Sequence, residues 1–254
     1  MVGLVVAFLV AAAGGALAAG TTFTWDGSSG NWTDGRWGQG ASYPGDGDIA
    51  IINSGTSLLD NSSAVLESLT MNGGTLLFTN WNTKLTASNV MVKSGATITH
   101  GANSATADPW TPDARVWIAC TNLDVQAGGK IDADNKGYTA TVGGRGPGQS
   151  GGQYYGAGHG GRGGHTIGSF GGATYGSAAA PEYPGSSSYT PGGGAIRIDA
   201  TAAVTVNGTI SASATQTSTS GGDGSGGSIL INCGIVSGTT GVVRAKGGTT
   251  PGWY

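Results

Sequence analysis

Charged residues are scarce in this chain: Lys, Arg, Asp and Glu together make up 10% of its 254 residues. The basic residues are scattered and the formal net charge is −3, so no basic stripe is present of the kind that binds nucleic acid through its phosphates. This scarcity also excludes the highly charged type of disordered protein. Glycine is abundant instead, at 51 residues, but it follows no period of three, which excludes a collagen triple helix.

Residues that carry acid–base or nucleophilic chemistry are also few. Glu occurs only at Glu67 and Glu182, and the G-x-S-x-G, phosphate-loop and HExxH signatures are absent from the sequence. Asp199 lies two residues from Arg197, but no second carboxylate has a defined acid or base role beside it. The sequence therefore predicts a protein that is not an enzyme, with a polysaccharide lyase or hydrolase as the less favoured alternative.

Only two cysteines are present. Aligning V116-W-I-A-C120, A195-I-R-I-D-A200 and S228-I-L-I-N-C233 places Cys120, Ala200 and Cys233 in one inward-facing column. Stacked strands lie about 4.8 Å apart, which separates the two cysteines by roughly 9–10 Å at Cα, beyond the limit of about 7 Å for a disulfide. The alignment predicts two free, buried thiols.

One short phrase recurs along the chain: an apolar pair with one residue between, a corner rich in Gly, Ser or Asn, and another apolar residue. The copies are L69-T-M-N-G-G-T-L76, V90-M-V-K-S-G-A-T-I98, L123-D-V-Q-A-G-G-K-I131, V204-T-V-N-G-T-I210 and, more loosely, I235-V-S-G-T-T-G-V242. Alternation of period two indicates strands with one buried face, and such units bury that face by stacking. The phrase predicts an all-β fold, a single-stranded parallel β-helix that forms a right-handed solenoid over residues 49–254.

The first 20 residues, MVGLVVAFLVAAAGGALAAG, are apolar and end in small residues. Ala16-Leu17-Ala18 fits the cleavage site of a secretory signal peptide, which predicts export and no membrane attachment after cleavage. No Lys or Arg precedes the apolar run. Two alternatives therefore stay open, a retained membrane anchor and an apolar arm that inserts into a neighbouring subunit.

Aromatic residues gather near both ends of the expected solenoid. Residues 21–48 carry three tryptophans, which we interpret as a hydrophobic cap over the first coil rather than a ligand platform. The opposite end lacks a helix to cover it, and uncovered strand edges are adhesive, so we expect end-to-end stacking of copies into a filament. The candidate end-stacking residues are Trp25, Trp32, Trp37, Trp253 and Tyr254.

Three insertions, at residues 100–115, 137–194 and 213–227, interrupt the spacing of the phrase at the same point of successive coils. Insertions at one coil position emerge on one side of a solenoid, where binding residues are usually placed. The longest insertion is rich in glycine and tyrosine. We consider three roles for it: packing against the coils, contact with another subunit, and stacking on the sugar rings of a glycan. The contact candidates are Tyr138, Tyr154, Tyr155, Tyr175, Tyr183, Tyr189, His159 and His165.

No cofactor or metal is expected. The two histidines of H159-G-G-R-G-G-H165 have no Cys or acidic neighbour in sequence, whereas zinc needs three or four ligands. The acidic turns G45-D-G-D48 and D132-A-D-N-K136 look like fragments of calcium loops, but the second has a lysine at the fifth loop position. Turn-forming Asp and Asn explain both segments, and calcium is the minor alternative.

The segment W25-D-G-S-S-G-N-W32 followed by Y43-P-G-D-G-D-I-A-I-I52 resembles the start of β-helical repeat regions in large bacterial surface proteins, of the autotransporter passenger-like and planctomycete-type Gly-rich kinds. The later G192-G-G-A-I-R-I-D-A200 stretch is similar to the Gly-rich repeats of the same proteins. The resemblance implies a secreted, extracellular or cell-surface protein without catalytic residues. We therefore expect a structural protein that assembles with itself, and as the alternative an adhesin or glycan-binding module.

Overall fold

The computed structural model describes residues 20–40, 42–141, 143–152, 154–164, 171–215 and 221–249. Its described residues form strands and loops without a helix, so they contain no helix that is long and apolar enough to cross a membrane. The strands are β1 (Thr22–Thr24), β2 (Ser29–Asn31), β3 (Ile49–Ile52), β4 (Thr56–Leu59), β5 (Val65–Met71), β6 (Thr75–Phe78), β7 (Leu85–Val92), β8 (Thr97–His100), β9 (Val116–Val125), β10 (Lys130–Asp132), β11 (Ala195–Val206), β12 (Thr209–Ser211), β13 (Ser228–Asn232), β14 (Ile235–Ser237) and β15 (Val242–Arg244).

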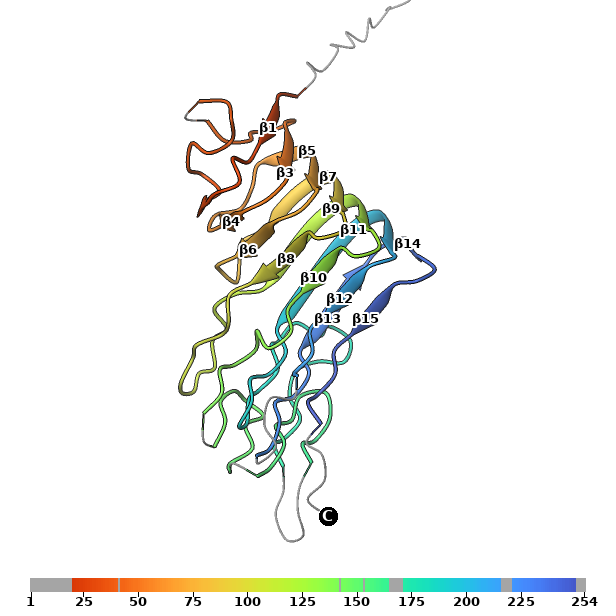
Figure 1. Cartoon of the computed structure of the whole chain (residues 1–254). Helices are drawn as coiled ribbons and strands as arrows, with labels where there is room; N and C mark the ends of the chain where they lie inside the picture. Colours follow the sequence, from red (N-terminus) through yellow and green to blue (C-terminus); the bar gives the residue numbers. More distant parts are fainter. Residues whose placement is uncertain are drawn as a thin grey trace, which may run out of the picture.

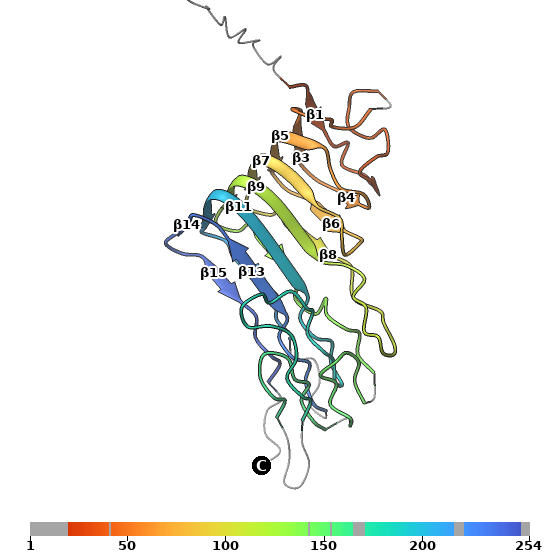
Figure 2. The ribbon, with the colours of Figure 1, turned by 180° about the vertical axis from the view of Figure 1, so that it is seen from behind.

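The strands form two parallel sheets, and the chain alternates between them (Figures 1 and 2). The first sheet has the order β1-β3-β5-β7-β9-β11-β13, with β14 also paired to β11, and the second has the order β15-β12-β10-β8-β6-β4-β2. A strand of the first sheet, a tight corner and a strand of the second sheet make one coil, and the coils stack along one axis. The fold is therefore all-β with parallel strands, as predicted, and is consistent with a parallel β-helix.

The recurring phrase occupies the same place in each coil, at the corner between the sheets. Leu69, Val90, Leu123 and Val204 pair in register, each with the next, and all four are buried. The residues after the corner, from Leu76 to Ile210, stack in the same way in the second sheet. We call such a line of stacked inward side chains a core column. Because the columns run through every coil, the apolar residue of one coil packs on that of the next.

The alignment of the loosest copy is wrong by one residue. Val236 rather than Ile235 pairs with Val204, and Val243 rather than Val242 pairs with Ile210. The physical reason is that two apolar residues stand side by side at each end of this corner, Ile235 with Val236 and Val242 with Val243, so alternation alone does not fix the register; the pairing of Ile235 with Ala203 fixes it. Ile235 and Val242 therefore fall out of the core columns, and Val236 and Val243 continue them.

The prediction that the cysteines are free is confirmed, but only Cys120 is buried, whereas Cys233 on the last described coil is half-buried. Cys120 pairs with Ala200 in the first sheet. In the next coil Asn232 pairs with Asp199, so the following residue, Cys233, lies beside Ala200 in the same core column. Both cysteines are free. Burial, with a smaller contribution from the Asp199 carboxylate, raises the pKa of the Cys120 thiol to about 11.

The N-terminal coil lies inside the segment expected to be a cap. β1 and β2 fall within residues 21–48 because this segment already pairs with β3 and β4. Trp25, Trp32 and Trp37 are 0–2% exposed and pack edge to face, with ring centroids 4.5–5.1 Å apart. They fill the core of the first coil, so their side chains are not exposed for contact between copies.

His100 is a fully buried titratable group of the stack. Its Nδ1 donates to the carbonyl of Gly101 at 2.6 Å, and its Nε2 accepts from the backbone N–H of Ala195 at 3.1 Å. Burial lowers the pKa of His100 to about 4, so the ring is neutral at pH 7. A neutral ring with this tautomer joins β8 to the start of β11.

We predict that acid destabilises the fold through His100. The unfolded chain binds a proton near pH 6.5 and the folded chain only near pH 4. The free energy of unfolding should therefore fall by about 3 kcal/mol between these pH values. Urea unfolding at a series of pH values measures this slope. His100→Gln, which keeps a donor and an acceptor but cannot titrate, should show a smaller slope, and an equal slope in the variant would contradict the assignment.

Candidate functional site

The long connections between coils gather on one side of the stack (Figure 1). Residues 101–115, 133–194 and 212–227 each follow a strand of the second sheet and lead back to the first sheet. These segments overlap the three insertions expected from the sequence. The longest begins and ends beside the other two, so all three contribute to one surface.

Glycine-rich segments of this side pack backbone against backbone. Gly172 donates to the carbonyl of Gly156 at 2.9 Å and accepts from Gly163 at 3.0 Å, while Gly158 donates to Gly148 at 2.8 Å. A Cβ atom on Gly163 would lie 1.8 Å from the carbonyl oxygen of Gly156, and one on Gly172 would lie 1.9 Å from that of Gly148. The segments are therefore close enough to exclude any side chain at these positions, which explains the abundance of glycine.

A groove of about 1580 Å³ opens between this glycine-rich layer and the last coil. One wall comes from residues 154–164 and 174–178, and the other from residues 221–229 and 243–248. Glycine is the commonest residue of its lining, and its aromatic side chains are Tyr154, Tyr155, Tyr175 and His159.

The predicted tyrosines do not form one row. Tyr138 is fully buried and donates to the carbonyl of Trp110 at 2.6 Å, while Tyr175 is half-buried and donates to that of Pro184 at 2.5 Å. Burial raises the pKa of both hydroxyls. Tyr154 is 62% exposed, and Tyr183 and Tyr189 are each 46% exposed.

Three of the predicted tyrosines therefore remain available on the surface, and only Tyr154 of these lines the groove. Tyr155 lines it as well and is half-buried.

His159 serves the packing of the loop. Its Nδ1 donates to the carbonyl of Gly226 at 2.8 Å, and its ring lies 4.5 Å from that of Tyr175. Burial lowers the pKa of His159, which favours the neutral ring. His165, Trp253 and Tyr254 lie outside the described residues. Among the described residues no three His, Cys, Asp or Glu side chains come together as metal ligands.

The acidic turns bind backbone amides. Asp48 accepts from Thr21 and Gly45, each at 2.8 Å, and Asp46 accepts from Val65 at 2.8 Å. In the second turn Asp134 accepts from the backbone N–H of Ser213 at 2.6 Å. These contacts agree with the interpretation of both segments as turn-forming.

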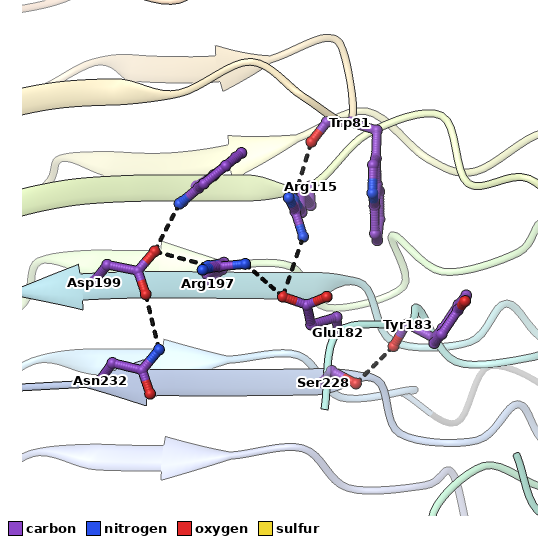
Figure 3. A network of polar contacts seen from close by, with 9 residues as sticks. Trp81, Arg115, Glu182, Tyr183, Arg197, Asp199, Ser228 and Asn232 are labelled. Carbon is purple, nitrogen blue, oxygen red and sulfur yellow. Dashed lines mark hydrogen bonds and ion pairs between the residues drawn. The ribbon is translucent and has the colours of Figure 1, made fainter. Parts of the chain in front are cut away.

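A network of arginine, tryptophan and carboxylate side chains covers the outer face of the first sheet (Figure 3). The Arg115 guanidinium lies between two indoles, 4.6 Å from the ring of Trp81 and 4.5 Å from that of Trp117. Glu182, from the longest connection, lies 2.6 Å from Arg197 and 3.8 Å from Arg115. Since Arg115 and Arg197 belong to successive coils, Glu182 holds the long connection against the sheet.

The Asp199 carboxylate of this network accepts three hydrogen bonds. Asp199 accepts from Arg197 at 2.7 Å, from Asn232 at 2.8 Å and from the indole of Trp117 at 2.9 Å. Although burial acts to raise it, these hydrogen bonds hold the pKa of Asp199 below its usual range. A general acid needs a carboxyl group whose pKa is raised, and Asp199 has the opposite property.

Sequence reasoning missed most of this network. The signal was available, because the alignment that placed the two cysteines also pairs Trp117 with Arg197 on the outward face. Trp81 and Arg115 lie in connections, where no strand pairing indicates a neighbour.

The last coil leaves its inward side uncovered. β13 and β15 end their sheets among the described strands, and β14 pairs only with β11. Val236 is 61% exposed and Val243 48% exposed, although their partners Val204 and Ile210 in the preceding coil are fully buried. We call this surface of β13, β14 and β15 the open face; the groove lies beside it, since Val243 lines both.

We predict that the backbone contacts between glycines stabilise the glycine-rich layer formed by the long connections. Gly163→Ala should lower the free energy of unfolding by about 1–3 kcal/mol, because its Cβ has no space beside Gly156. Gly161→Ala is the matched control, since nothing lies within 4 Å of its Cβ, and its effect should stay within about 0.5 kcal/mol. Urea unfolding and proteolysis of the 133–194 connection measure both. Equal behaviour of the two variants would contradict the close packing.

A comparison with protein families finds a match for part of the chain. Residues 36–144, which include β3 to β10, match the G8 domain, a domain found in extracellular proteins. No curated protein and no solved structure matches the chain. The comparisons give no support for the specific autotransporter or planctomycete repeat families. They support only the broader expectation of an extracellular protein, because residues 36–144 are similar to an extracellular domain.

Proposed function

We propose that this chain is a non-catalytic structural protein of the cell surface or extracellular matrix, built as a right-handed parallel β-helix, that associates with itself through the open face. The G8 match supports an extracellular location in general terms. The secretory role of residues 1–20 is part of the same proposal. The observation that carries the association is the pair of unfilled core columns at Val236 and Val243.

Two properties of the open face support this proposal. Each core column needs another apolar residue on top of its last member, and exposed apolar patches of this kind mark protein interaction sites. The strand edges also offer unpaired backbone groups to a further strand. Natural edge strands usually block such addition with charge, but Arg244 is the only charged residue in β13, β14 and β15.

We predict that charge in the two columns abolishes association. Val236→Lys combined with Val243→Lys should weaken it at least about 100-fold, because two apolar contacts are lost and two ammonium groups would be buried. Light scattering after gel filtration, over a range of concentrations, measures the mass of the wild type and of the variant. In dilute solution, where both are single chains, the two should melt at similar temperatures, since neither valine is buried in the single chain.

Val65→Lys is the matched control, because Val65 is 58% exposed but lies on β5, away from the open face. It should associate like the wild type. A wild type that remains a single chain at all concentrations would overturn the proposal.

The groove favours a second candidate, a glycan-binding or adhesin module. Its aromatic rings and polar backbone are suited to stacking on sugar rings and to hydrogen bonds with hydroxyl groups. The groove borders the open face, so self-association and glycan binding would compete.

A glycan array with the wild type, followed by titration of any ligand found, tests this candidate. Tyr154→Ala should weaken binding by about 10-fold or more, whereas Tyr189→Ala, exposed but outside the groove, should leave it unchanged. An array without a signal, or equal losses in the two variants, would remove the candidate.

A further inference from the structure

We propose that the open faces of two copies meet about a two-fold axis, so that assembly closes as a pair instead of growing head to tail into a filament. The inference rests on the proposed function, since it takes association through the open face as given. It depends on a difference between the two ends of the stack.

The N-terminal edge of the first sheet is closed by the chain itself. The backbone N–H groups of Thr24 and Asp26 point away from β3 and donate to the carbonyls of Trp37 (3.2 Å) and Arg36 (2.9 Å). The carbonyl of Thr22 accepts from the side chain of Gln39 at 3.1 Å. These three groups of β1 and its extension are among those that a further parallel strand would use, and the chain already binds them.

The N-terminal edge of the second sheet is closed in the same way. The backbone N–H of Asn31 in β2 donates to the Asp34 carboxylate at 2.8 Å, and its carbonyl accepts from the Asp34 backbone at 3.0 Å. The Asp34 and Arg36 side chains also lie over Gly30, within 3 Å of where its Cβ would be. An incoming coil would have to displace this segment before it reached β2.

The open face has the opposite character. Its core columns end in Val236 and Val243, more than 40% exposed, whereas the tryptophans of the first coil are buried. Head-to-tail stacking would place this apolar face on a closed and polar end. The surface that best matches an open face is therefore a second open face, which offers apolar columns and unpaired strand edges. A two-fold contact of this kind uses up the adhesive surface of both copies and stops.

Charge does not oppose the pairing. Arg244, the only charged residue of β13 to β15, turns back toward the preceding coil: its Nε donates to the Ser211 hydroxyl at 3.0 Å and its Nη2 lies 3.6 Å from the Asp134 carboxylate. The guanidinium is partly neutralised within its own chain. Two facing copies therefore meet without an uncompensated arginine pair.

A capture experiment distinguishes a pair from a filament. Tagged Val236→Lys/Val243→Lys protein is mixed with untagged wild type and recovered on the tag. In a head-to-tail filament this variant keeps an intact N-terminal end, to which wild type still binds. In a two-fold pair it has no usable surface. Tagged wild type and tagged Val65→Lys protein are the positive controls, and light scattering gives the masses.

We expect wild type with the mass of two chains, retention of untagged wild type by both controls, and none by the double variant. Retention by the double variant, or masses above two chains, would overturn the pair and leave association through the open face intact. A wild type that stays a single chain would overturn both proposals. If the double variant fails to fold by circular dichroism, Val243→Lys alone takes its place with the same expected loss.

Discussion

Backbone hydrogen bonding between successive parallel strands is the constraint on which the rest of the structure depends. It fixes the register of every coil on the one before, so that Leu69, Val90, Leu123 and Val204 stack as one core column. A stack of this kind has two ends, and each end needs its backbone groups and apolar residues covered. Here the two ends differ: the segment around Trp37 covers one, and the described residues leave the other open. The proposed assembly follows from that difference.

The same constraint explains the glycine-rich side of the molecule. Connections that leave the stack at one coil position must pack beside one another at the spacing of the strands, and extended segments at that spacing leave no space for Cβ atoms at Gly163 or Gly172. The glycine-rich layer therefore continues the stacking of the coils beyond the strands. Glu182, bound to Arg197 and Arg115, fastens it to the outer face of the first sheet. This arrangement gives the groove two fixed walls, one from the glycine-rich layer and one from the last coil.

Much of the arrangement was predictable because it repeats. Alternation and corners gave the strands, and aligned copies gave the core columns and the two free thiols. The prediction failed where a coil departs from the repeat, since the adjacent apolar residues Ile235 and Val236 leave the register undecided, and Val236 takes the column position expected for Ile235. The site was harder to predict. Burial separates Tyr138 from Tyr154 although both lie in one insertion, because loop packing depends on contacts that no local pattern encodes. The stacking of Arg115 on Trp81 depends on such contacts too.

Hydrogen–deuterium exchange at several protein concentrations tests the central claim most directly, because it reports both ends of one chain at once. The account predicts that amides of β1 and β2 exchange slowly at every concentration. Amides of β13, β14 and β15 should exchange fast in dilute solution and become protected as the concentration rises. Exchange in β13 to β15 that does not depend on concentration, or concentration-dependent protection at β1 and β2, would contradict it.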